Sequence, residues 1–138
     1  MTPAQALAGR EQLRWERIAI GIRCAYNPGQ PAVIRQYLTL GCRLARSGRV
    51  PERRVMQRML QLLLQTAHDD ALPWLWRSAC IEHTTLPLAR LSSLLAAQDP
   101  VAVEALHAFV QVAQDRLGQV PPAGRLGPVD PQKGVLTR

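Results

Sequence analysis

The chain has 138 residues and a net charge of +7, and 47% of its residues are hydrophobic but only 4% aromatic. This length suits a single domain with a substantial core. No apolar run is long enough for a transmembrane helix, and we see no secretory signal. A core built mainly from aliphatic residues favours helices over sheets. We therefore expect a compact all-α bundle in the cytoplasm, with no membrane partner.

The three cysteines also favour the cytoplasm. Cys24, Cys42 and Cys80 are odd in number and lie far apart in the sequence. They fit reduced, buried thiols better than a disulfide framework.

Positive charge is concentrated in the first half of the chain. Residues 1–70 carry eleven arginines against five acidic residues, whereas residues 71–138 carry six basic residues against five acidic ones. Arg35, Arg43 and Arg46 fall opposite the apolar face of one predicted helix, where they could bind an acidic protein or nucleic acid. The alternative is an arginine-rich surface that contacts only solvent.

Five prolines predict where the helices begin, because proline is tolerated in the first turn. They are Pro3, Pro31, Pro51, Pro73 and Pro100. We expect five helices, over about 2–26, 31–47, 51–68, 70–97 and 99–117, with a kink or break of the fourth helix at Pro87. They form one domain, 1–118. Residues 119–138 are rich in proline and glycine and are expected to be a disordered tail.

Apolar periodicity indicates which helix faces are buried. The third helix is apolar over more than half of its circumference, which places Leu63 in the core. Its wet edge comprises Arg54, Gln57, Arg58, Gln61 and Gln65. Gly41 lies on the apolar face of the second helix and predicts a close helix–helix approach. The apolar faces of the other helices include Leu7, Trp15, Ile22, Tyr26, Leu106, Phe109 and Val110.

The tryptophan-containing helix has two apolar faces. Trp76 shares one with Leu72, Leu75, Ala79, Cys80 and Leu86 and is assigned to the core. Trp74 lies on the opposite face with Arg77. An exposed Trp–Arg pair is a typical protein-interface feature, although both tryptophans could be core residues. A buried Arg77 would need an acidic partner such as Glu82, Asp69 or Asp70.

One pair of residues has the spacing of metal ligands. Cys80 and His83 are one helical turn apart, and His68, Asp69 and Asp70 could approach them from the preceding loop. The alternative is a core cysteine beside a partly buried histidine. No catalytic motif is recognisable, and no cofactor is expected.

The stretch Leu72-Pro73-Trp74-x-Trp76-Arg77-Ser78-x-Cys80, followed by Pro87-Leu88, resembles the FagA family of small bacterial proteins. Ile22-Arg23-Cys24-Ala25, Pro28, Pro31, Ile34, Tyr37-Leu38 and Gly41 are similar to the same family. The resemblance spans about residues 15–95. It implies a cytoplasmic protein of operons induced by iron limitation, found beside an iron-independent fumarase and a manganese superoxide dismutase. It implies no activity and no catalytic residues.

Together these features lead us to expect a non-enzymatic helical protein that binds a protein partner, in the setting of iron limitation. The expected binding surface is Trp74, Arg77 and the arginines of the first half. The alternatives are nucleic-acid binding through those arginines and metal binding through Cys80 and His83. Self-association is also compatible with the sequence.

Overall fold

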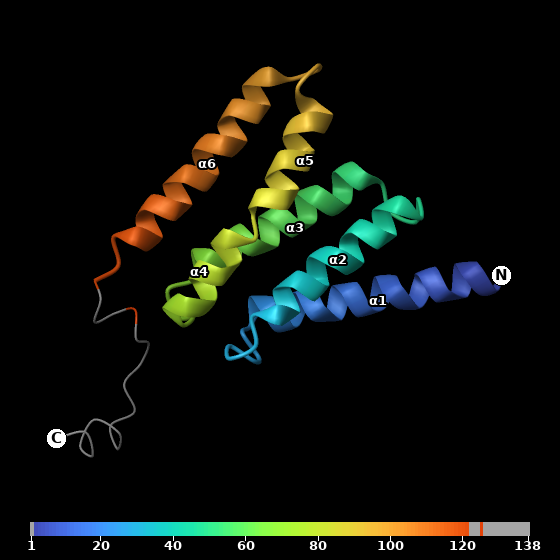
Figure 1. Cartoon of the computed structure of the whole chain (residues 1–138), viewed down its shortest axis with the longest axis horizontal. Coiled ribbons are helices and arrows are strands. Elements are labelled where there is room, and N and C mark those ends of the chain that lie inside the picture. Colours follow the sequence, from blue (N-terminus) through green and yellow to red (C-terminus); the bar gives the residue numbers. More distant parts are fainter. Residues whose placement is uncertain (1, 122–124, 126–138) are drawn as a thin grey trace, which may run out of the picture.

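The computed structural model describes residues 2–121 and Arg125, and this part of the chain contains six α-helices (Figure 1). They are α1 (Pro3–Arg23), α2 (Ala32–Arg46), α3 (Glu52–Ala67), α4 (Trp74–Glu82), α5 (Thr85–Leu95) and α6 (Pro100–Gly118). The residues described contain no strand, so the predicted all-α bundle is confirmed. Most of the expected tail, 119–138, lies outside the described residues.

The five prolines mark helix starts as predicted. Pro3 and Pro100 are the first residues of α1 and α6, and Pro31, Pro51 and Pro73 immediately precede α2, α3 and α4. Asp99 caps α6, since its side chain accepts a hydrogen bond from the backbone N–H of Ala102.

The first helix ends three residues earlier than expected. Ala25 adopts a left-handed conformation with φ of 49°. The backbone N–H of Tyr26 then bonds to the carbonyl of Gly21, and that of Ala25 to the carbonyl of Ile22. These two bonds are the Schellman pattern that closes a helix C-terminus. Tyr26 therefore lies in the loop and is exposed.

The predicted tryptophan helix is two helices, α4 and α5. The chain turns at His83 and Thr84, and the buried Thr84 hydroxyl donates a 2.6 Å hydrogen bond to the carbonyl of Ile81. Pro87 lies in the first turn of α5, where its missing N–H removes no helical hydrogen bond. The break thus falls before Pro87 rather than at it.

The central helix is α3, which packs against all five others. In Figure 1, α1 and α2 lie on one side of α3, and α5 and α6 lie on the other. Leu63 is fully buried, as predicted. Gly41 allows α2 to approach closely, because a Cβ atom there would lie 2.6 Å from the Met59 sulfur and 2.9 Å from Nε1 of Trp15.

Periodicity placed some side chains on buried faces that no neighbour covers. The exposed ones are Leu7, Tyr26, Leu75, Leu86 and Phe109. The pattern of one helix shows which face is apolar, but not whether another helix reaches it. The prediction that these five side chains are buried is therefore wrong.

Candidate functional site

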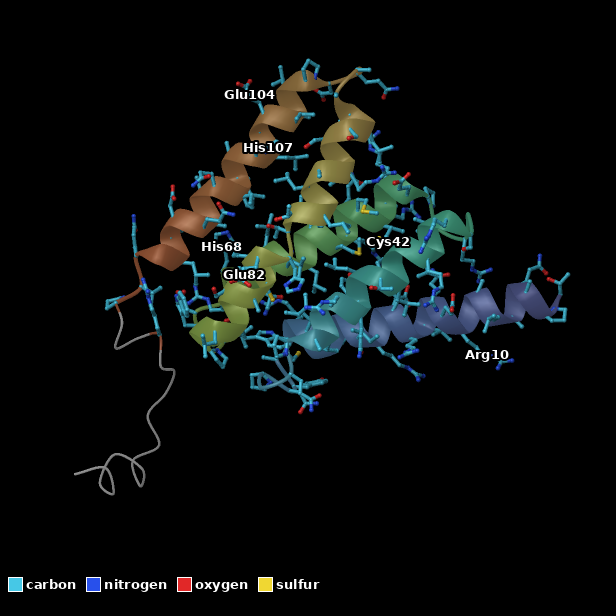
Figure 2. The ribbon with its side chains drawn as sticks, in the orientation of Figure 1. Arg10, Cys42, His68, Glu82, Glu104 and His107 are labelled. Carbon is cyan, nitrogen blue, oxygen red and sulfur yellow. The ribbon has the colours of Figure 1, made fainter. Side chains whose placement is uncertain are left out.

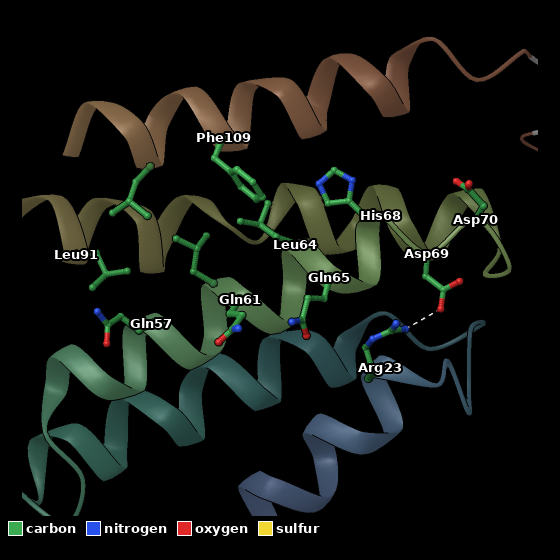
Figure 3. A pocket seen from close by; sticks show the side chains of 12 residues that line it. Arg23, Gln57, Gln61, Leu64, Gln65, His68, Asp69, Asp70, Leu91 and Phe109 are labelled. Carbon is green, nitrogen blue, oxygen red and sulfur yellow. Dashed lines mark hydrogen bonds and ion pairs between the residues drawn. The ribbon is translucent and has the colours of Figure 1, made fainter. Parts of the chain in front are cut away.

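A groove runs along α3, with α5 and α6 as its wall. Its volume is about 890 Å³ (Figure 3). The lining residues are Arg23, Gln57, Leu60, Gln61, Leu64, Gln65, His68, Asp69, Asp70, Leu91, Leu106 and Phe109. From Gln57 to His68, the C-cap of α3, the groove follows about 16 Å of helix at 1.5 Å per residue.

The wall of the groove is apolar. Phe109 extends from α6 over the groove, beside Leu64 of α3, and is 56% exposed (Figure 3). Leu106 of α6 lines the same groove. The Phe109 ring meets the His68 imidazole edge to face, with 6.0 Å between ring centroids. A large, exposed aromatic ring held in this way is an apolar contact for a ligand.

The side of the groove along α3 is polar but uncharged. Gln57, Gln61 and Gln65 recur every four residues, so their amides form a row along one face of α3, visible in Figure 3. All three side chains are exposed, as predicted for this solvent-facing edge of α3. Each amide can both donate and accept hydrogen bonds.

Charged groups gather at one end of the groove and are paired. A nitrogen of the Arg23 guanidinium donates a 2.7 Å hydrogen bond to Asp69. The bond from Arg23, with one from the backbone N–H of Ala71, lowers the pKa of the Asp69 carboxyl. The neighbouring Asp70 accepts a 3.2 Å bond from Arg77. The groove therefore carries no net charge at this end.

The prediction that Arg77 forms an exposed binding surface with Trp74 is wrong. Arg77 is only 8% exposed, and its Nε donates a 2.7 Å hydrogen bond to the carbonyl of Ala67. Its acidic partner is Asp70, one of the three residues considered. Trp74 is half-buried and donates from Nε1 to the carbonyl of Leu117 at 3.0 Å. The cation over its ring is Arg125, at 4.8 Å, rather than Arg77.

The predicted arginines of α2 are exposed but do not form one patch. Arg35 and Arg43 line a shallow depression of about 370 Å³ with Arg14 of α1. Arg43 also forms a 2.9 Å ion pair with Glu11. Arg46 lines a different depression, beside Cys42.

Of the two metal candidates, Cys80 lies in α4 and His83 directly follows the last residue of that helix, and no further ligands join them among the described residues. Cys80 is fully buried, and burial raises the pKa of its thiol to about 12. Nδ1 of His83 lies 2.7 Å from the carbonyl oxygen of Ala79. Across the described residues, no three His, Cys, Asp or Glu side chains are grouped as metal ligands. His68 and Asp69 line the groove instead.

The sequence did not indicate the groove, for a physical reason. The glutamine row and Phe109 were both visible in the sequence, but they lie 44 residues apart between Gln65 and Phe109. Their proximity depends on how the α5–α6 pair folds back over α3. The sequence signal for this apolar side of the groove is Phe109, a large aromatic residue on α6.

No helix among the described residues is both long and apolar enough to cross a membrane. No protein-family model, curated protein or solved structure matches this chain.

Proposed function

We propose that this chain is a cytoplasmic, non-enzymatic interaction protein whose groove along α3 binds an amphipathic helix of another protein. The observation that carries the proposal is the lining of that groove, which is apolar along α5 and α6 and amide-bearing along α3. This combination matches helix-in-groove recognition, in which apolar side chains enter the groove and polar ones bond at its edge.

The dimensions of the groove support a helical ligand. About 16 Å of length corresponds to about eleven residues, or three turns of helix. The apolar side chains of such a segment, spaced three or four residues apart, would pack against Leu64, Leu106 and Phe109. Its polar flank would face the amides of Gln57 and Gln61. Because the charges at the Arg23–Asp69 end are already paired, contacts in the groove would be mainly apolar and hydrogen-bonding.

We further propose that the protein acts in the cytoplasm of bacteria under iron limitation. Cys24, Cys42 and Cys80 are all unpaired, which supports a cytoplasmic location. Only Cys80 is buried as predicted, whereas Cys24 is exposed and Cys42 is partly exposed. The resemblance of residues 72–88 to the FagA family supports iron-starved cells as the place to seek the partner.

The test is site-specific photo-crosslinking in iron-starved cells, with the photoreactive residue at position 109 or at position 112. Phe109 and Val112 are both on α6 and are 56% and 52% exposed, but only Phe109 lines the groove. We expect a discrete crosslinked partner from position 109, mapped by mass spectrometry to one helical segment, and little from position 112. Equal crosslinking from both positions, or none from position 109, would contradict the proposal.

A further inference from the structure

A second surface of the molecule combines exposed arginines with exposed apolar side chains. It is the outward side of α1, which we name the α1 outer face: Arg10, Leu13, Arg14, Arg17 and Ile20. The three arginines are exposed, and Leu13 and Ile20 are each 55% exposed. Figure 2 shows Arg10 pointing away from the other helices.

Helical spacing arranges these residues in two adjacent rows. Leu13 and Ile20 are seven residues apart, as are Arg10 and Arg17, so each pair lies along the same side of the helix. An apolar row therefore runs beside a basic row.

The α1 outer face is positively charged without compensation. The two acidic residues of α1 pair with other helices: Glu11 with Arg43 at 2.9 Å and Glu16 with Arg58 at 3.6 Å. Within the described part of the chain, no carboxylate forms an ion pair with Arg10, Arg14 or Arg17. The charge of this face thus remains available to an acidic ligand.

The same charge argues against self-association through this face. If two copies packed antiparallel about the midpoint between Arg10 and Arg17, Arg10 of one copy would lie opposite Arg17 of the other. Parallel packing would place identical arginines together. Both arrangements bring like charges into contact, which opposes binding. Nucleic acid also fits poorly, since phosphates would satisfy the arginines but leave Leu13 and Ile20 in water.

We infer that the α1 outer face binds an acidic amphipathic helix of a partner protein. Apolar side chains of that helix cover Leu13 and Ile20, and its carboxylates pair with Arg10, Arg14 and Arg17. Arginine suits this role because its planar guanidinium bonds carboxylates in a bidentate manner. The inference is independent of the groove along α3, because it involves none of the groove-lining residues.

The experiment measures fluorescence anisotropy of a labelled helical peptide of about 20 residues added to the full chain. The peptide carries leucines at heptad spacing, flanked by glutamates, and a second peptide carries lysines in place of the glutamates. The protein variants are Arg10→Glu/Arg17→Glu, Leu13→Gln and the control Arg53→Glu/Arg54→Glu, which makes the same charge change on α3. Circular dichroism confirms that each variant is folded.

We expect the acidic peptide to bind and the lysine peptide not to bind. Arg10→Glu/Arg17→Glu and Leu13→Gln should each weaken binding by at least about tenfold, whereas the control should change it by less than about threefold. The inference is overturned if the acidic peptide does not bind, or if Leu13→Gln has no effect. It is also overturned if a DNA duplex binds more tightly than the peptide and loses affinity only with the arginine variant.

Discussion

Arg77 reaches from α4 back to the end of α3, where its Nε donates a 2.7 Å hydrogen bond to the carbonyl oxygen of Ala67. Ala67 is the last residue of α3, so its carbonyl has no partner within the helix. The guanidinium also bonds Asp70 in the turn between the two helices. Arg77 therefore joins α3, the turn and α4 from a buried position.

Replacing Arg77 with methionine keeps an apolar stem but removes the hydrogen bonds to Ala67 and Asp70. We expect Arg77→Met to lower the free energy of unfolding by about 1–3 kcal/mol, because the carbonyl of Ala67 loses its buried donor. Urea denaturation measures the loss. Arg35→Met, at an exposed position that forms no ion pair within the described part of the chain, should change the free energy of unfolding by no more than about 0.5 kcal/mol. Equal effects at both positions would show that Arg77 does not cap α3.

The two tryptophans of α4 are expected to differ in their importance for stability. Trp76 is 1% exposed and donates from Nε1 to the carbonyl of Ile22 at 2.9 Å, so it ties α4 to α1. Trp76→Ala should lower the free energy of unfolding by about 3–5 kcal/mol or prevent folding. Trp74 is half-buried against the end of α6, and Trp74→Ala should cost less. Thermal melting of both variants measures the difference. Equal losses of stability would show that both tryptophans contribute equally to the core.

The helices and most of the core could be predicted from the sequence because they depend on local signals. Pro51 and Pro100 set helix starts, the apolar breadth of α3 identified Leu63, and Gly41 predicted a close approach. Each of these depends on residues within a few turns of one helix. The same reasoning failed at Phe109, because the covering of α6 depends on the direction in which the α5–α6 pair returns.

The candidate site was less predictable for a related reason. Arg77 was placed beside Trp74 on one helix face, and helical spacing cannot show that the α3–α4 turn brings Ala67 and Asp70 within reach. For the same reason, the sequence could not distinguish Asp70 from Asp69 and Glu82 as the acidic partner of Arg77. A site formed between helices far apart in the chain leaves only scattered signals in the sequence, such as the row from Gln57 to Gln65.

Alkaline pH should destabilise the protein through its buried thiol. Burial raises the pKa of Cys80 from 9.0 to about 12. Between these values the unfolded thiol loses its proton while the folded one retains it, so the native state binds more protons and stability falls as pH rises. The slope from this group approaches about 1.4 kcal/mol per pH unit. Burial also raises the pKa of the Tyr37 hydroxyl, which acts in the same direction.

Chemical denaturation at a series of pH values from neutral to strongly alkaline measures this dependence. Cys80→Ala removes the titrating group, so its stability should fall less steeply above the ordinary thiol pKa. Cys24→Ala is the control, because Cys24 is exposed, and it should follow the parent curve. Parallel curves for the parent and Cys80→Ala would contradict the assignment.

Gly41 and Gly9 offer a final, matched test of how the helices pack. Both lie inside helices, where alanine is intrinsically favoured over glycine by about 1 kcal/mol. At Gly9 the nearest atom to an added Cβ is the flexible guanidinium of Arg49 at 3.6 Å, an ordinary contact. At Gly41 the Cβ would lie 2.9 Å from Trp15 Nε1 and 2.6 Å from the Met59 sulfur. Both of those side chains are fully buried, and the rigid ring of Trp15 has little room to move aside.

We therefore expect opposite signs for the two substitutions. Gly9→Ala should raise the free energy of unfolding by about 0.5–1 kcal/mol through helix propensity alone. Gly41→Ala should lower it by about 1–3 kcal/mol, because the strain of overpacking between α1, α2 and α3 exceeds the gain in propensity. Urea denaturation of the two variants gives both values. If Gly41→Ala proved as stabilising as Gly9→Ala, α2 could not lie as close to Trp15 and Met59 as the structure places it.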